Sequence, residues 1–152
     1  MSPIYILRHR RENLKKCSLT GLETREGLIF STYPLDPWPD LAGCLVLKVG
    51  APTLTKADAG RPLLLIDGTW RLAQIMESQL PHKLEERSLP SGWRTAYPRR
   101  QTDCPDPEAG LASIEALYVA CLILEKPTEG LLDRYYWKDA FLEKNKIHLS
   151  VQ

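Results

Sequence analysis

The chain has 152 residues, 43% of them hydrophobic and 26% charged, which is the balance of one compact globular unit rather than a disordered or fibrous chain. Its net charge of +1 excludes a strongly basic nucleic-acid-binding protein, so any RNA contact has to be local. The apolar runs are far shorter than the roughly 18 residues that span a bilayer, and arginines directly after the first run argue against a secretory signal. We therefore expect a soluble, cytoplasmic protein with no membrane partner.

Four short apolar runs predict β-strands, at residues 4–7, 28–30, 44–49 and 63–66. The last two runs are continuous and rich in Leu and Val, which favours central strands that are covered on both faces. A proline-rich segment at 33–39 cannot be a helix interior and predicts a turn region. The first half of the chain is therefore expected to consist mainly of strands.

Helical patterns follow in the second half of the chain. Residues 69–80 and 111–125 carry apolar side chains at helical spacing, and a proline follows each run. Thr128 is predicted to cap a last helix that runs to about residue 146. Residues 98–110 are rich in proline and predict a loop, and a long loop in a small domain is often functional.

The sharpest motif is the sequence Asp67-Gly68-Thr69-Trp70, which comes directly after a predicted buried strand. In open α/β sheets, ligands bind beyond the carboxyl ends of the strands, where a loop meets the start of a helix. Asp67 is expected at that edge, and Trp70 is expected to form an apolar wall for a ligand. The spacing equally fits a structural role, in which Asp67 or Thr69 caps the helix and Trp70 fills the core. The motif alone leaves both roles open.

Two basic clusters are candidate RNA-binding surfaces. The first cluster comprises Arg8, Arg10, Arg11, Lys15 and Lys16. The second cluster comprises Arg94, Arg99 and Arg100, with Trp93 and Tyr97 between them. Cations mixed with aromatic rings are typical of sites for single-stranded RNA, whereas solvated surface charge and internal ion pairs are the alternative interpretation.

Other familiar kinds of site are not indicated by the sequence. The four cysteines, Cys17, Cys44, Cys104 and Cys121, are widely spaced and form no CxxC pair, so we expect neither a metal site nor a disulfide framework. The histidines are scattered, and no nucleophile–histidine pairing is legible. Glycine-rich phosphate loops are absent, which disfavours a nucleotide triphosphatase or a dinucleotide enzyme.

Several motifs together resemble a known superfamily of enzymes. Asp67-Gly68-Thr69-Trp70 resembles the D-x-T-W signature of the DTW-domain proteins, which transfer a 3-amino-3-carboxypropyl group from S-adenosylmethionine to RNA uridines. The rest of the chain is similar to the ribosome-biogenesis aminocarboxypropyltransferases that modify small-subunit rRNA. The matching segments, in the order of that family, are Lys15-Lys16-Cys17-Ser18, Ser88-Leu89-Pro90, Leu111-Ala112-Ser113-Ile114-Glu115-Ala116 and residues 136–145.

The resemblance implies an α/β, SPOUT-like knotted fold, with a small, mostly parallel sheet in an N-terminal lobe and a helical C-terminal lobe. We place the lobes at 1–88 and 89–152 and expect them to form a single compact unit around an S-adenosylmethionine pocket. The implied protein is a monomer, and its reaction leaves methylthioadenosine and uses no metal.

The resemblance also implies a role for each matched residue. Ser18 is expected to contact the ribose of S-adenosylmethionine. Ile66 and Leu89 are expected to hold its adenosine, and Ser113 to line the same pocket. The remaining roles fall to three residues: Trp70 and Ala73 enclose the sulfonium methyl group, and Asp67 lies nearest the reacting centre. Asp67 and Trp70 are therefore the predicted catalytic residues.

The sequence departs from the rRNA-modifying family just before the third matched segment. Ala109, also expected beside the cofactor, stands where that family has an aromatic residue, and residues 110–116 are closer to the DTW pattern. The RNA target is therefore rRNA by preference, with tRNA as the alternative. A SPOUT-like RNA methyltransferase and a non-catalytic RNA-binding assembly factor are the rival classes.

Overall fold

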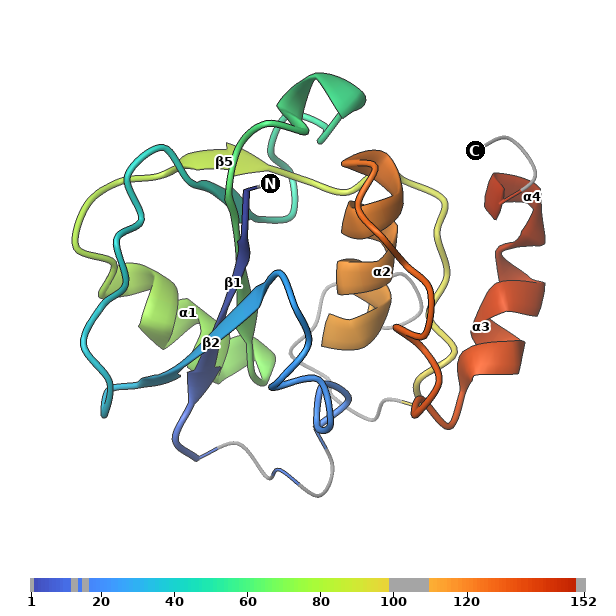
Figure 1. The fold of residues 1–152 in the computed structure, drawn as a ribbon, viewed down its shortest axis with the longest axis horizontal. Helices are drawn as coiled ribbons and strands as arrows, with labels where there is room; N and C mark the ends of the chain where they lie inside the picture. The colour runs from blue at the N-terminus through green and yellow to red at the C-terminus, as the bar shows by residue number, and fades with distance from the viewer. Residues whose placement is uncertain (1, 12–13, 15–16, 99–109, 150–152) are drawn as a thin grey trace.

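The computed structural model describes residues 2–11, 14, 17–98 and 110–149, which form a sheet with helices on both faces (Figure 1). The strands are β1 (Ile4–His9), β2 (Leu28–Tyr33), β3 (Leu45–Leu47), β4 (Leu63–Asp67) and β5 (Glu85–Arg87). The α-helices are α1 (Trp70–Ser78), α2 (Ser113–Ile123), α3 (Lys138–Lys144) and α4 (Lys146–Leu149), and a 3₁₀ turn covers Lys56–Asp58. The predicted α/β class is thereby confirmed.

The five strands are parallel throughout, in the order β2-β1-β4-β3-β5. Strands β1 and β4 pair in register, with Ile4 opposite Leu63 at one end and Arg8 opposite Asp67 at the other. Because parallel strands end at the same edge of a sheet, the carboxyl ends of β1, β2 and β4 lie side by side. The prediction of a small parallel sheet is confirmed, and this carboxyl edge is where the sequence placed the site.

Helices α1 and α2 cover opposite faces of the sheet. Leu65 of β4 packs with Leu117 of α2, whereas the next residue back, Leu64, packs with Met76 of α1. Side chains alternate between the faces of a strand, so a strand buried on both faces needs an uninterrupted apolar run. The sequence of β4 has that property. None of the helices among the described residues is long and apolar enough to cross a membrane.

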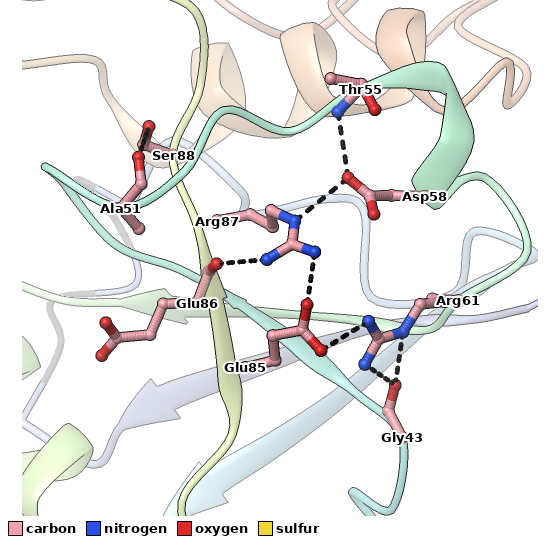
Figure 2. A network of polar contacts seen from close by, with 9 residues as sticks. All are labelled: Gly43, Ala51, Thr55, Asp58, Arg61, Glu85, Glu86, Arg87 and Ser88. Carbon is pink, nitrogen blue, oxygen red and sulfur yellow. Dashed lines mark hydrogen bonds and ion pairs between the residues drawn. The ribbon is translucent and has the colours of Figure 1, made fainter.

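Strand β5 was not predicted, because Glu85 and Glu86 favour an exposed helix or loop over a strand. It pairs with β3 at the edge of the sheet, and a network of charges holds it there (Figure 2). Arg87 lies between Asp58, at 3.3 Å, and Glu85, while Arg61 contacts Glu85 at 2.9 Å. Charged side chains are a common way to protect an edge strand from pairing with other chains.

The predicted last helix over 128–146 is wrong in its first half. The chain makes turns over 129–134, and only α3 and α4 are helical. The backbone N–H of Leu131 donates to the carbonyl of Thr128 at 3.0 Å, which closes a turn rather than a helix. Gly130 has a φ of +75°, a left-handed conformation that ends helical geometry and that glycine adopts without steric cost.

One apolar core joins the two predicted lobes. It contains Leu65 and Ile6 from the sheet together with Leu117 and Phe141 from α2 and α3. The lobe boundary between residues 88 and 89 stays a prediction, as does the knotted, SPOUT-like topology.

Candidate active site

Asp67 is the last residue of β4 and lies at the carboxyl edge of the sheet, only 4% exposed. Its carboxylate faces α2, because Asp67 shares that face of the strand with Leu65. Oδ1 accepts a hydrogen bond from the Ser113 hydroxyl at 2.6 Å. Oδ2 accepts from the Cys17 thiol at 3.1 Å and from Arg8 Nε at 3.5 Å. The Asp67 network, as we call these four residues, joins β1, β4, α2 and the segment after β1.

Arg8 supplies the positive charge of the Asp67 network. It lies opposite Asp67 in the β1–β4 register, and its guanidinium also contacts Glu23 at 3.1 Å and the Cys17 sulfur at 3.6 Å. The same group stacks over the ring of Phe30, 4.9 Å from its centre. Burial alone lowers the pKa of Arg8, but Cys17, Glu23 and Asp67 raise it overall. The carboxylate of Asp67 is therefore held beside a permanent cation.

Cys17 acts in the Asp67 network as a neutral donor. Burial is the main reason that the pKa of its thiol is raised to about 11, and the negative charge of Asp67 raises it further. A thiol with that pKa keeps its proton at neutral pH and can donate it to Oδ2 of Asp67. This role of Cys17 could not be predicted from its place in the Lys-Lys-Cys-Ser segment.

Ser18 and Ser113 meet at the start of α2. The N-cap of α2 is Ala112, which has no hydroxyl to accept from the first turn of the helix. Ser18 Oγ takes that place and accepts a hydrogen bond from the backbone N–H of Ile114 at 3.1 Å. In Figure 1, β1 runs downwards in the view, and α2 starts at the lower end of that helix. Two of the predicted cofactor-binding residues, from distant parts of the chain, therefore lie at the start of α2, and one of them, Ser113, bonds to the Asp67 carboxylate.

Glu115, in the first turn of α2, forms a second buried network. Its two carboxylate oxygens accept four hydrogen bonds, from Thr95 Oγ1 at 2.6 Å, Ala112 N at 2.8 Å, Ala96 N at 2.9 Å and the Tyr135 hydroxyl at 2.9 Å. Glu115 is completely buried. The Glu115 network holds residues 95–96 and the turn before α3 against the helix that carries Ser113.

Trp70 and Ala73 lie on α1 and are both half-buried. The hydroxyl of Thr69 accepts from the Leu72 backbone N–H at 3.3 Å, so Thr69 is the N-cap of this helix. The structural alternative for Trp70 does not hold for the described residues, because Trp70 is not among the side chains that make up either apolar core. Its ring is therefore available at the start of α1, near the end of β4.

The two residues expected to hold adenosine lie on different faces of the sheet. Ile66 packs against the core beneath α1, and Leu89, two residues beyond the end of β5, packs against the core beneath α2. The structure thus brings the Ser113 hydroxyl to Asp67 and the Ser18 hydroxyl to the backbone N–H of Ile114, the residue after Ser113. Trp70 begins α1, which covers the other face of the sheet.

The basic residues divide between the interior and the surface. Arg8, which we predicted to contact RNA, is 7% exposed and committed to Asp67. Alternate residues of a strand share one face, so Arg8 lies on the same buried face of β1 as Ile4 and Ile6. This alternation is the signal in the sequence that predicts a buried Arg8. Arg10 and Arg11 are exposed, and their side chains form no ion pair within the part of the chain that the structure describes.

The other predicted site residues are more peripheral. Arg94 has an exposed side chain, while its backbone N–H and carbonyl are both held by the side chain of Asn145. Five predicted site residues lie outside the described residues: Lys15, Lys16, Arg99, Arg100 and Ala109. Among residues 2–11, 14, 17–98 and 110–149, no group of three or more His, Cys, Asp or Glu side chains is arranged to hold a metal ion.

Comparison with known proteins gives one informative result. No protein-family model matches the chain, and no curated protein matches it by sequence. Among solved structures, it is similar to the SAM-dependent rRNA:acp-transferase Tsr3 from Vulcanisaeta distributa, with a TM-score of 0.73 and 24% sequence identity. The likeness covers 99% of this chain and 82% of that one. The two proteins therefore share their fold over essentially the whole of this chain.

Proposed function

We propose that this protein transfers the 3-amino-3-carboxypropyl group of S-adenosylmethionine to a uridine or pseudouridine of RNA, with rRNA as the preferred target. One observation carries the proposal: the whole chain superposes on a SAM-dependent rRNA:acp-transferase. The resemblance of the Asp67–Trp70 and Ser113–Ala116 segments to the same class of enzyme supports it independently. The knotted topology, the monomeric state and the cytoplasmic location belong to the same proposal.

The side chains at the carboxyl edge suit a sulfonium compound. A buried carboxylate that forms an ion pair with Arg8 offers a negative charge to a cationic sulfur or amino group. The Ser113 hydroxyl bonds to this carboxylate, the Ser18 hydroxyl bonds to the start of the same helix, and the ring of Trp70 lies outside both cores. When bound, S-adenosylmethionine supplies a γ-carbon that bonds to the pyrimidine nitrogen as its bond to sulfur breaks, releasing methylthioadenosine.

Asp67 has the geometry of an orienting group rather than a base. Three protein donors already use its two oxygens, so accepting a further proton would disrupt the hydrogen bonds that hold it. We assign Asp67 to fixing the position of the cofactor by its charge, with the ring proton passing to solvent.

Trp70 and Ala73 are assigned to the choice among the three carbons attached to sulfur. The nucleophile reaches only the carbon that is presented to it, so hiding the methyl group directs attack to the aminocarboxypropyl chain. A bulky ring and a small apolar residue one turn apart on α1 can form such a wall. The nucleoside part of S-adenosylmethionine is assigned, as the resemblance implies, to Ser18, Ile66, Leu89 and Ala109.

Arg10, Arg11 and Arg94 form the proposed RNA-binding surface, together with the basic residues outside the described ranges. Arg8 is removed from this surface because its charge is used inside the protein. Replacing Arg10 and Arg11 by Glu should weaken RNA binding and lower the slope of log K against log salt by about 2. For the single reversals Arg10→Glu and Arg11→Glu, the charge-matched control is Lys56→Glu in the 3₁₀ turn at the upper edge of Figure 1. Unchanged RNA binding in the double variant removes this surface from the proposal.

The decisive experiment is a transfer assay with S-adenosylmethionine labelled separately in its methyl and its carboxyl group. Carboxyl label in unmodified total RNA is the expected result, and the size of the labelled RNA distinguishes rRNA from tRNA. Methyl label identifies a methyltransferase and contradicts the assignment of Trp70 and Ala73. RNA binding without either label indicates a non-catalytic assembly factor.

A further inference from the structure

His9 is a buried polar residue at the carboxyl edge that the proposed function does not use. It is the last residue of β1, directly after Arg8, and it pairs in register with Tyr33 of β2. By alternation it lies on the α1 face of the sheet with Leu7, opposite the face of Asp67. His9 is only 7% exposed.

The imidazole ring of His9 is held in one orientation. Nδ1 accepts a hydrogen bond from the backbone N–H of Arg11 at 3.0 Å. One side of the ring contacts Tyr33, with ring centres 5.6 Å apart, and Tyr33 in turn contacts Trp38 at 5.9 Å. Because Nδ1 is the acceptor, the neutral ring carries its proton on Nε2. Burial, followed by the charges of Arg11 and Arg10, lowers the pKa of His9 and favours this neutral form.

Nε2 of His9 has no hydrogen-bond partner among the described residues. A buried donor without an acceptor is destabilising, and such groups are rare enough in folded proteins to need an explanation. The group stands one residue from the Arg8–Asp67 pair, and the exposed side chains of Arg10 and Arg11 follow it. A donor with cations beside it suits an acceptor that is carried on a sugar–phosphate backbone, as a nucleobase is.

We propose that the Nε2–H of His9 donates a hydrogen bond to a carbonyl oxygen of the target uracil ring, beside the nitrogen that reacts. This inference rests on the proposed function, since it names the contact that receives the RNA base. Uracil has a carbonyl beside each candidate nitrogen, N3 of uridine and N1 of pseudouridine. As the nitrogen attacks and loses its proton, charge spreads onto that carbonyl, and a fixed donor stabilises it there. His9 thereby assists the loss of the ring proton without a base.

Two amide variants separate this role from a structural one. His9→Asn keeps an acceptor near the position of Nδ1 and so preserves the bond from Arg11, but it has no donor at the position of Nε2. His9→Gln extends an amide N–H towards the position of Nε2 and gives up the bond from Arg11. We expect His9→Gln to retain most of the transfer to RNA and His9→Asn to lose it by about 10- to 100-fold in kcat. The affinity for S-adenosylmethionine should stay within about twofold in both, which also shows that both are folded.

The possible results separate the two proposals. If the wild-type protein transfers no carboxyl label to RNA, the proposed function fails and the His9 assignment fails with it. If the wild type is active and His9→Asn is equally active, only the His9 assignment fails. Loss in both variants, or in His9→Gln alone, identifies the ring as a structural support for the turn at Arg11 and overturns the proposal.

A measurement on the wild-type protein avoids the question of folding in the variants. With ¹⁵N-labelled histidine, the Nε2–H signal of His9 should be that of the neutral Nε2–H tautomer. Adding S-adenosylhomocysteine and a short uridine-containing oligonucleotide should shift that signal downfield, whereas the matched oligonucleotide with abasic sites in place of uridine should not. An Nε2–H signal that responds equally to both oligonucleotides contradicts the contact.

Discussion

Asp67 and Glu115 are two buried carboxylates, the first bonded to Ser113 and the second two residues after it, and their hydrogen-bond donors differ in kind. Glu115 accepts from two backbone N–H groups and two hydroxyls, and no cation among the described residues contacts it. Within the same part of the chain, Asp67 accepts from three side chains, namely a guanidinium, a thiol and a hydroxyl. Backbone donors are fixed in direction, whereas a hydroxyl can turn and accept instead of donating. Glu115 is therefore built to hold the chain together, and Asp67 to present a charge at the sheet edge.

The largest expected effect is on stability, in Glu115→Ala. The change leaves the N–H groups of Ala96 and Ala112 and the hydroxyl of Tyr135 without their acceptor in the interior, and we expect the free energy of unfolding to fall by about 3–5 kcal/mol. Glu115→Gln should not rescue it, because each oxygen accepts from one backbone N–H, and an amide NH₂ in place of either oxygen would face that donor. Urea denaturation measures the loss, with exposed Glu143→Ala as a control expected within about 0.5 kcal/mol.

Asp67→Asn should lower stability only slightly but should lower activity strongly. The amide can keep its oxygen towards Arg8 and Cys17 and donate to the Ser113 hydroxyl, so we expect a loss of only about 1 kcal/mol in stability. Loss of the charge should lower aminocarboxypropyl transfer by about 100-fold or more and weaken S-adenosylmethionine binding in parallel. Turnover that disappears at unchanged cofactor affinity contradicts the orienting role and makes Asp67 a base. A loss of stability as large as that of Glu115→Ala removes the distinction between the two networks.

The fall of stability at alkaline pH should sharpen the same comparison, since the Cys17 thiol bonds to Asp67 and no thiol among the described residues bonds to Glu115. The folded protein keeps the proton of Cys17 up to about pH 11, whereas the unfolded chain loses it from its usual value near 9.0. Between these values the unfolded state binds fewer protons, so stability falls as the pH rises. In Cys17→Ser this part of the fall should disappear, because a hydroxyl does not ionise in that range. Equal falls in wild type and variant, measured by denaturation at pH 7.5 and pH 10.5, contradict the assignment.

Local patterns in the sequence predicted the parts of this protein that depend on local physics. The apolar run before Asp67 predicted a buried strand, and the alternation of faces was enough to expect a site where that strand ends. The same alternation could have placed Arg8 inside, in step with Ile4 and Ile6, but the density of nearby positive charge favoured a surface role. The density of basic residues in a segment does not show which of them is buried in an ion pair, as Arg8 is here.

Contacts between distant segments account for what the sequence did not predict. Strand β5 is formed by charged residues whose partners, Asp58 and Arg61, come from more than twenty positions earlier (Figure 2). Cys17 and Ser113 reach Asp67 from 50 and 46 residues away. The four donors of Glu115 could not be predicted from the Ser113–Ala116 segment, because three of them come from other parts of the chain.

The smallest expected effect is on stability, in Thr69→Ala, and it concerns the different hydrogen bonds at the starts of α1 and α2. Thr69 caps α1 through one hydrogen bond to the Leu72 N–H, whereas Glu115 bonds the backbone N–H of Ala112 at the start of α2 and holds three further groups. Thr69→Ala should therefore cost about 1 kcal/mol, the usual value of an N-cap, and Thr69→Ser should cost almost nothing. Thermal unfolding of both variants, beside Glu115→Ala, measures how much of the effect of Glu115 exceeds capping. If Thr69→Ala is as destabilising as Glu115→Ala, capping alone explains Glu115, and its contacts to residues 95–96 and to Tyr135 contribute little.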